Sequence, residues 1–320
     1  MIQVSDFSAR PNCPACGASG REIFHRPYSD DLLRISLTNF YGVVGKLDYE
    51  TLDGATYAVA ECTGCRSYFQ SQIPSDVLLG RLYEEWIDPE MARIRFHKGQ
   101  PAYRSFLLAK EAMLSVAQLK PDAPRTALDY GCGWGEWSLI TKGFGMESWA
   151  TELSPSRRAN AQQLAIRTVD EDELPDAYFG LINLDQVLEH MPNPEQCLRK
   201  LAEKLHPDGI LRVAVPTAWR VANALKNFDR EIARPGLGDL NAIAPLEHLN
   251  AFSQAGIVQL AAKVGLERVR PTWASLAQTT VFPSGWLAKI KAVLLPFYLR
   301  GRFTTQLYFR TKPAQTAELR

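Results

Sequence analysis

The sequence predicts an α/β protein in which a mostly parallel sheet carries helices on both faces, with a small zinc ribbon at the N-terminus. Two observations support this prediction. An apolar strand near residues 125–130 runs into a glycine-rich turn and then into a helical pattern, as in a nucleotide-binding βα unit. Two Cys-x-x-Cys pairs, Cys13/Cys16 and Cys62/Cys65, have the spacing of zinc ligands.

The composition is that of a folded protein with no strongly charged partner. Hydrophobic residues make up 46% of the 320 residues and charged residues 22%. Lys plus Arg (36) balances Asp plus Glu (35), so nucleic acid is a disfavoured partner. The first residues lack the apolar stretch of a secretory signal, and the apolar run at 292–299 is shorter than the roughly 20 residues of a transmembrane helix. We therefore expect a cytoplasmic protein without a transmembrane segment.

The two cysteine pairs predict a structural zinc site. Two thiolates separated by two residues can face the same metal ion, and four thiolates close the tetrahedral coordination of Zn²⁺. No open position is then left for a catalytic water. Free buried cysteines or a redox pair are the alternatives. Cys132 and Cys197 stand alone and are read as buried apolar side chains.

The glycine-rich turn contains Gly131, Gly133 and Gly135. Glycine lets the backbone pass close beneath a ligand, and the Gly-x-Gly-x-Gly spacing departs from the Gly-x-Gly-x-x-Gly of dinucleotide enzymes. Glu152 follows 21 residues after Gly131, at the end of the next strand-like stretch. An acid at that distance can accept hydrogen bonds from both ribose hydroxyls of a bound nucleoside.

These motifs continue along the chain in an order typical of one family. Residues 128–135 read LDYGCGWG, Asp170-Glu171 is an acidic pair after the third strand, 188–190 read LEH, and 206–217 read HPDGILRVAVPT. Residues 247–253, EHLNAFS, complete the set. The region 125–217 resembles the nucleotide-binding core of the class I S-adenosylmethionine-dependent methyltransferases. The resemblance implies a Rossmann-like, seven-stranded sheet, completed here by an antiparallel strand at 304–311, and S-adenosylmethionine as cofactor.

The resemblance also implies roles for single acidic residues. Asp129 either steadies the glycine turn or binds the methionine amine, and either Asp170 or Glu171 binds the adenine amine. Asp185 is assigned to the cofactor site as well. With the glycines and Glu152, these residues form the predicted cofactor-binding set.

The acceptor side is the less specific part of the prediction. A base is needed only where the acceptor holds its proton tightly, and His190 and His248 are the candidates because histidine titrates near neutral pH. His190 serves equally well as a positioning hydrogen-bond partner. Glu247 is a further catalytic candidate, as a base or as a group that orients a histidine, and Asp185 has the same two alternatives. Arginines between 220 and 234 could hold an anionic group of the substrate or be solvated surface charge.

We therefore divide the chain into a zinc ribbon (1–75), a helical linker or lid (76–120) and a methyltransferase domain (121–320), with an acceptor loop at 218–250 and a helical insertion at 280–303. The predicted reaction is O- or C-methylation of a sugar, a sugar nucleotide or another small metabolite. One alternative is an RNA methyltransferase that uses the basic residues of 93–104. The other is a non-catalytic module that binds the cofactor. The helical pattern at 286–302 either covers the sheet or rests on a membrane surface.

Overall fold

The computed structural model of the chain describes residues 6–41, 47–87, 101–280, 285–301 and 304–312. These residues form two compact units, and each is described by itself. The first, the N-terminal unit, comprises residues 1–101, 186–194 and 215–259. The second, the sheet unit, comprises residues 102–185, 195–214 and 260–320.

The sheet unit contains a seven-stranded sheet in the order β12-β13-β10-β9-β6-β7-β8. All neighbouring pairs from β10 to β8 are parallel, whereas β13 is antiparallel to both β10 and β12. This confirms the predicted mostly parallel α/β fold and its antiparallel final strand. The strands are β6 (Thr126–Tyr130), β7 (Glu147–Thr151), β8 (Arg167–Thr168), β9 (Phe179–Asp185), β10 (Leu205–Ala214), β12 (Leu266–Val269) and β13 (Gln306–Thr311).

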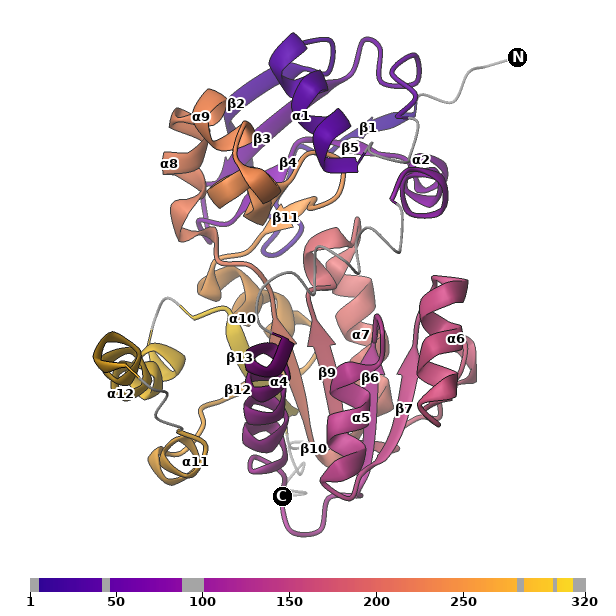
Figure 1. Cartoon of the computed structure of the whole chain (residues 1–320), viewed down its shortest axis with the longest axis vertical. Helices are drawn as coiled ribbons and strands as arrows, with labels where there is room; N and C mark the ends of the chain where they lie inside the picture. Colours follow the sequence, from indigo (N-terminus) through magenta and orange to yellow (C-terminus); the bar gives the residue numbers. More distant parts are fainter. Residues whose placement is uncertain (1–5, 42–46, 88–100, 281–284, 302–303, 313–320) are drawn as a thin grey trace, which may run out of the picture. The chain divides into compact units, whose positions relative to one another are not determined.

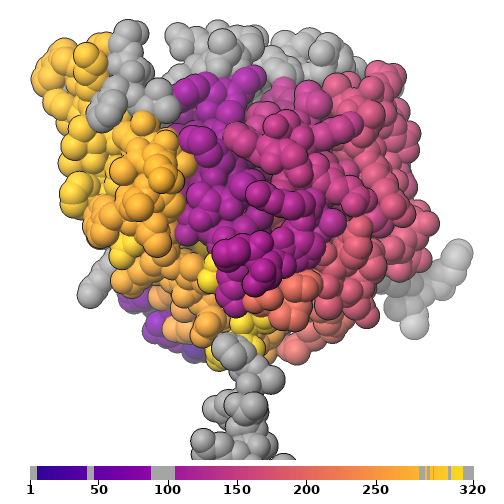
Figure 2. All heavy atoms as spheres, turned by 90° about the horizontal axis from the view of Figure 1, so that it is seen from below, coloured from indigo at the N-terminus to yellow at the C-terminus, as the bar shows by residue number. Residues whose placement is uncertain are grey.

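Helices lie on both faces of this sheet, with α4 and α5 in front of it and α7 behind it in Figure 1. Seen from below, the segment around α4, in purple, lies between the C-terminal helices, in yellow and orange, and the segments of α5 and α6, in magenta and pink (Figure 2). The helices are α4 (Pro101–Val116), α5 (Glu136–Gly143), α6 (Pro155–Gln163), α7 (Pro194–Lys204), α10 (Gln254–Lys263), α11 (Trp273–Gln278) and α12 (Trp286–Arg300).

Local sequence explains where these elements begin and which face they bury. The central strand β9 is a run of buried residues because both of its faces are covered. Helix α6 begins at Pro155 directly after Ser154, as predicted, since the fixed φ of proline suits the first helical position. In α7, Leu198 and Leu201 are buried, three positions apart on the face that packs against the sheet.

The N-terminal unit is built on a four-stranded antiparallel sheet, β11-β4-β3-β2, beside the pair β1-β5. Its strands are β1 (Phe7–Ala9), β2 (Gly20–Pro27), β3 (Thr56–Cys62), β4 (Tyr68–Gln70), β5 (Gln72–Pro74) and β11 (Asn250–Ala251). Its helices are α1 (Asp31–Tyr41), α2 (Asp76–Arg81), the π-helical turn η1 (Leu82–Trp86), α8 (Val221–Lys226) and α9 (Phe228–Ile232), with 3₁₀ turns η3 (Leu188–His190), η4 (Ala218–Arg220) and η5 (Pro235–Ile243).

The units divide the chain differently from the predicted domains. Residues 215–259, which contain the predicted acceptor loop, pack with the N-terminal sheet, and α4, within the predicted linker, packs in the sheet unit. The reason is apolar burial: Phe228 and Leu240 share one buried cluster with Leu33 and Tyr57 of the N-terminal segments.

The predicted insertion at 280–303 contains α12, whose buried Leu299 belongs to the core of the sheet unit and whose Trp286 and Phe297 are exposed. Residues 281–284 and 302–303 lie outside the described part of the chain. Among the described helices, none is long and apolar enough to cross a membrane.

Candidate functional site

The glycine turn connects β6 to α5 and is fastened to the end of the neighbouring strand β7. The backbone N–H groups of Gly131 and Cys132 both donate to the carbonyl of Thr151, at 3.0 Å each. Asn160 of α6 donates to the carbonyl of Trp134 at 2.7 Å. These bonds hold the turn against β7 and α6, so its backbone has a fixed shape before any ligand arrives.

Glu152 and the glycine turn meet directly. The carboxylate of Glu152 accepts a hydrogen bond from the N–H of Gly133 at 2.8 Å and another from the N–H of Ser154 at 2.9 Å. A carboxylate offers about four acceptor positions, so these two bonds leave positions for hydroxyl donors. The two strongest elements of the sequence prediction therefore lie at one place, at the carboxyl ends of β6 and β7.

Two glycines of the turn face different surroundings. At Gly133 (φ +55°) nothing lies within 4 Å of where a Cβ would stand, so the backbone is open to a ligand on that side. At Gly135 (φ +80°) a Cβ would stand 3.0 Å from Ile166 and 3.3 Å from Ala161. Gly135 thus allows α6 to pack closely, and the open side of Gly133 is compatible with the predicted close approach of an adenosyl group. The acceptor oxygens of Glu152 and this open backbone fit S-adenosylmethionine.

Asp129 belongs to a buried polar network beneath the turn. Its carboxylate is 4% exposed and accepts from Ser138 Oγ and from Asn183 Nδ2, both at 2.8 Å. Arg212, 1% exposed, donates to Asn183 Oδ1 at 2.7 Å and to Glu111 at 2.8 Å. Burial raises the pKa of Asp129 to about 6, although the bonds from Asn183 and Ser138 act in the opposite direction. These contacts tie the end of β6 to α5 and β9, and both predicted roles of Asp129 remain predictions.

Asp185, at the end of β9, lies 3.5 Å from the guanidinium of Arg212. Its predicted contact with the cofactor remains a prediction. Neither Asn183 nor Arg212 was predicted from the sequence, although a polar and a charged residue within the apolar strands β9 and β10 are the available signal.

The two candidates for the adenine contact have different neighbours. Asp170 pairs with Arg158 and caps the 3₁₀ turn η2 (Glu171–Glu173). Glu171 accepts from the hydroxyl of Tyr130, the residue before Gly131, at 3.0 Å, and from Lys200 at 3.1 Å. Glu171 is therefore linked to the glycine turn through Tyr130.

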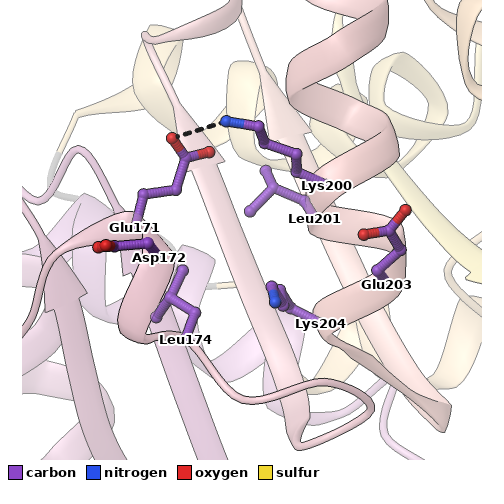
Figure 3. Close-up of a pocket in the computed structure, with 7 residues that line it drawn as sticks. All are labelled: Glu171, Asp172, Leu174, Lys200, Leu201, Glu203 and Lys204. Atoms are coloured by element: carbon purple, nitrogen blue, oxygen red, sulfur yellow. Dashed lines mark hydrogen bonds and ion pairs between the residues drawn. The ribbon is translucent and has the colours of Figure 1, made fainter.

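A pocket of about 420 Å³ lies between η2 and α7, and the pair Glu171–Lys200 stands at one side of it (Figure 3). Its other lining residues are Asp172, Leu174, Leu201, Glu203 and Lys204. The lining includes neither the glycine turn nor Glu152, so we do not assign the cofactor to this pocket.

The predicted catalytic residues lie in the N-terminal unit. His190 of η3 and His248 have ring centroids 4.6 Å apart with the rings nearly perpendicular. The carbonyl of Glu247 lies 3.1 Å from His190 Nδ1, whereas the Glu247 carboxylate accepts from the buried hydroxyl of Tyr41 at 3.3 Å. Burial raises the pKa of Tyr41 well above its usual range. The structure thus brings the two histidines together and turns the side chain of Glu247 toward a tyrosine.

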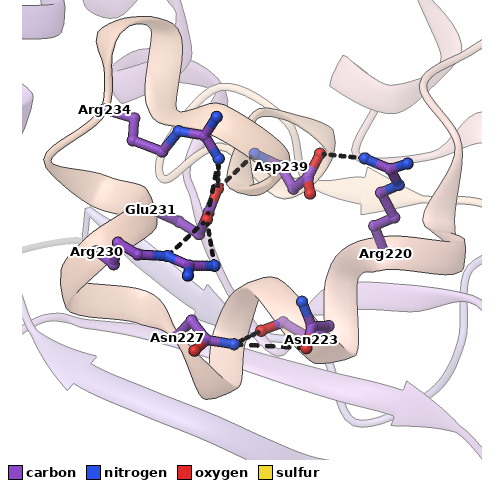
Figure 4. Close-up of polar contacts among 7 residues, drawn as sticks. All are labelled: Arg220, Asn223, Asn227, Arg230, Glu231, Arg234 and Asp239. Atoms are coloured by element: carbon purple, nitrogen blue, oxygen red, sulfur yellow. Dashed lines mark hydrogen bonds and ion pairs between the residues drawn. The ribbon is translucent and has the colours of Figure 1, made fainter.

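The arginines predicted to hold an anion are paired with acids of the same segment (Figure 4). Glu231, 2% exposed, accepts from Arg230 and Arg234 at 3.0–3.1 Å, and Arg220 lies 3.5 Å from Asp239. The N–H of Asp239 and the two arginines lower the pKa of Glu231. This arrangement fastens η5 and α9, and it reduces the positive charge available to a substrate. The basic residues predicted at 93–98 lie outside the described part of the chain.

The four cysteines of the two pairs form one cluster. All four Sγ atoms lie within 4.8 Å of one another, with Cys13–Cys65 at 3.6 Å and Cys16–Cys62 at 3.3 Å. Tetrahedral zinc with Zn–S bonds of about 2.3 Å places its sulfurs about 3.8 Å apart, so the cluster fits the ion. Cys13 Sγ and Cys65 Sγ share a hydrogen bond, which lowers the pKa of Cys65 and, together with burial, raises the pKa of Cys13. A metal ion would replace that shared proton.

Comparison with known proteins identifies the family. Residues 102–270 match the family model described as a methyltransferase domain. The chain belongs to the class I S-adenosylmethionine-dependent methyltransferases. This confirms the family that the motifs between 125 and 217 predict.

Individual relatives are distant. A curated relative, the probable chloroplastic tocopherol O-methyltransferase of Oryza sativa subsp. japonica, is 25% identical over 225 residues, 60% of this chain and 61% of the relative. A TehB-like S-adenosylmethionine-dependent methyltransferase from Corynebacterium glutamicum is 19% identical with a TM-score of 0.40, covering 63% of this chain and 88% of that one. The 1,6-didemethyltoxoflavin-N1-methyltransferase of Burkholderia thailandensis is 15% identical with a TM-score of 0.45, covering 80% and 95%.

Proposed function

We propose that this methyltransferase transfers the methyl group of S-adenosylmethionine to a small-molecule acceptor, at oxygen or carbon, and that the sugar class predicted from the sequence is the first to test. The observation that supports this proposal is the hydrogen bond from the Gly133 N–H to the Glu152 carboxylate. This bond places a carboxylate that can accept the ribose hydroxyls next to an open stretch of backbone. The bound cofactor supplies a methyl group activated by the positive charge of its sulfonium. The protein's main task is then to align donor and acceptor, which can contribute roughly 7–11 kcal/mol.

Within the cofactor site, Glu152 would accept the ribose hydroxyls, and Gly133 would let the ligand approach the backbone. Glu171, Asp170 and Asp185 remain predicted contacts. The acceptor's proton is predicted to leave to His190 or His248, with Glu247 as the further candidate.

Two findings favour a small acceptor over a nucleic acid. The chain as a whole carries a formal net charge of +1, and the arginines of residues 220–234 are paired with Glu231 and Asp239. The curated relative is named a probable tocopherol O-methyltransferase. The cysteine cluster would bind one structural zinc ion, and its thiolates suit a reducing compartment such as the cytoplasm.

Calorimetry with S-adenosylmethionine tests the assignment. Glu152→Ala removes an acceptor of two charge-assisted ribose bonds worth about 1.5 kcal/mol or more each, so affinity should fall about 100-fold or more. Asp176→Ala is the control, because it removes a carboxylate that is 76% exposed in the same unit. Equal affinities of Glu152→Ala and the wild type would refute the ribose assignment.

Methyl transfer is tested with labelled cofactor and panels of sugars, sugar nucleotides, phenols and RNA. Labelling of a small molecule supports the proposal, and labelling of RNA alone would overturn it. If the wild type binds no S-adenosylmethionine, the proposed methyl transfer is refuted.

A further inference from the structure

A second group of metal-ligating side chains lies in the N-terminal unit, apart from the cysteines. Glu189, His190 and His248 each offer one ligand atom, and these atoms lie within 4.8 Å of one another. Glu189 is 0% exposed, His248 is 7% exposed and His190 is half-buried. The two histidines are the acid–base candidates of the sequence, whereas Glu189 has no predicted role.

The two segments that carry these ligands are held together by a shared set of hydrogen bonds. Asn250 Nδ2 donates to the carbonyl of Met191 at 2.8 Å and lies 3.3 Å from the carbonyls of Leu188 and Glu189. Gln70 Nε2 donates to the carbonyl of His248 at 3.0 Å. Both donors are buried, so the ligand positions are fixed by the fold and do not depend on a bound ion to bring them together.

The ring nitrogens are oriented as in known metal sites. His248 Nδ1 contacts the carbonyl of Asn241, and His190 Nδ1 lies 3.1 Å from the carbonyl of Glu247 and 2.8 Å from the hydroxyl of Tyr83. A carbonyl oxygen only accepts, so the contacts with Asn241 and Glu247 are hydrogen bonds when Nδ1 carries the proton, and the Tyr83 hydroxyl then acts as an acceptor toward His190. Nε2 of each ring then carries the lone pair. Metal-binding histidines usually donate their other ring N–H to a carbonyl or carboxylate in this way.

We propose that Glu189, His190 and His248 bind one divalent transition-metal ion through a carboxylate oxygen and two imidazole nitrogens. Two neutral imidazoles and one carboxylate suit Zn²⁺, Fe²⁺, Co²⁺ or Ni²⁺ better than Mg²⁺ or Ca²⁺, which prefer oxygen ligands. A dication would also stabilise the negative charge of a carboxylate that is fully removed from water.

Three protein ligands leave at least one coordination position for water or for an oxygen of a ligand. His190 is the half-buried member of the set, so we place the open position on its side. The cysteine cluster is chemically distinct because its four thiolates close the coordination sphere. An imidazole that binds a metal ion has no free lone pair, so with the ion in place neither histidine acts as the base proposed above and Glu247 is the remaining candidate. The binding of S-adenosylmethionine proposed above does not depend on this metal site.

Cobalt titration of the full chain tests the proposal. The protein is stripped of metal with a chelator under reducing conditions and titrated with Co²⁺ alone, followed by calorimetry and visible absorption. The wild type should bind two equivalents: one with the strong thiolate-to-cobalt bands of the cysteine cluster, and one with only the weaker bands of nitrogen and oxygen ligands. A single equivalent, with thiolate bands only, would overturn the proposal.

Variants assign the second equivalent. Glu189→Gln and His190→Ala should each lower the affinity for the second equivalent of Co²⁺ by about 100-fold or more, which exceeds the effect of losing a hydrogen-bond partner of a ligand. Both variants should still bind the first equivalent, which is held by the thiolates. His25→Ala is the control, because His25 is an exposed histidine of the same unit. Since Glu189 is buried, circular dichroism must show that Glu189→Gln folds. If this variant does not fold, the binding measured for His190→Ala tests the site, because His190 is only half-buried. Unchanged binding of both equivalents in His190→Ala would refute the site.

Discussion

The stability of the sheet unit should depend on pH through Asp129. Burial raises the pKa of this carboxyl from 3.8 to about 6 in the folded protein. A raised pKa means that the folded state holds the proton more tightly than the unfolded state. The resulting stabilisation is complete below pH 3.8 and is lost as the pH rises through about 6. At about 1.36 kcal/mol per unit, the whole effect amounts to about 3 kcal/mol.

About half of this effect falls between about pH 5 and about pH 8. From the two pKa values, the contribution of Asp129 to the free energy of unfolding falls by about 1.4 kcal/mol between about pH 5 and about pH 8. Asp129→Asn removes the titration and keeps the contacts, because the amide oxygen can accept from Asn183 and the amide N–H can donate to the hydroxyl of Ser138. The difference in unfolding free energy between wild type and Asp129→Asn should therefore change by that amount.

Urea unfolding at several pH values measures this difference, and two-state behaviour is checked with a second probe. Asp176→Asn, which removes an exposed carboxylate of the same unit, controls for the loss of one negative charge. If the difference between wild type and Asp129→Asn is the same at both ends of the range, Asp129 does not titrate as its burial requires.

Three further substitutions test the glycine turn and the cysteine cluster. Gly135→Ala should lower the free energy of unfolding by about 2 kcal/mol, because its Cβ would crowd Ile166 and Ala161 at a positive φ. Gly133→Ala should lower the free energy of unfolding by about 1 kcal/mol and the affinity for S-adenosylmethionine about tenfold or more, since its methyl group would enter the open space above the turn. Thermal unfolding measures the stability of both variants and calorimetry measures their cofactor affinity. A larger loss of stability in Gly133→Ala and a larger loss of affinity in Gly135→Ala would contradict this prediction. Cys16→Ser should lose one zinc ion per chain by mass spectrometry and lower the unfolding temperature of the N-terminal unit, and a full zinc content in this variant would argue against the cysteine site.

The meeting of the glycine turn and Glu152 could be predicted because these residues are close in sequence and follow the strand order. Gly133 and Glu152 are separated by one helix, and in a parallel βαβ unit the carboxyl ends of successive strands share one edge of the sheet. The network beneath the turn could not be assembled in this way. Asp129, Asn183 and Arg212 lie on three separate strands, and their contact depends on the register of β6, β9 and β10.

The position of the segment around His248 on the N-terminal sheet was also beyond the sequence, because it depends on a very short strand. β11 contains two residues, too few for a periodic pattern, yet it pairs with β4 and places the segment around His248 on the N-terminal sheet. The same segment is hydrogen-bonded to the turn that carries the second cysteine pair. Ser253 Oγ donates to the carbonyl of Cys65, and the N–H of Ser253 donates to Ser67 Oγ at 3.0 Å.

This connection links the cysteine cluster to the proposed Glu189–His190–His248 metal site of the N-terminal unit. Cys65 belongs to the cysteine cluster, and its carbonyl accepts a hydrogen bond from Ser253. In the same segment, Asn250 Nδ2 contacts the backbone carbonyls of residues 188, 189 and 191. Loss of the metal from the cysteines should therefore loosen the segment that carries His248 as well as the ribbon itself. Hydrogen exchange at residues 248–253 should rise in Cys16→Ser, because the free energy that keeps these amides closed comes partly from the turn that carries the second cysteine pair.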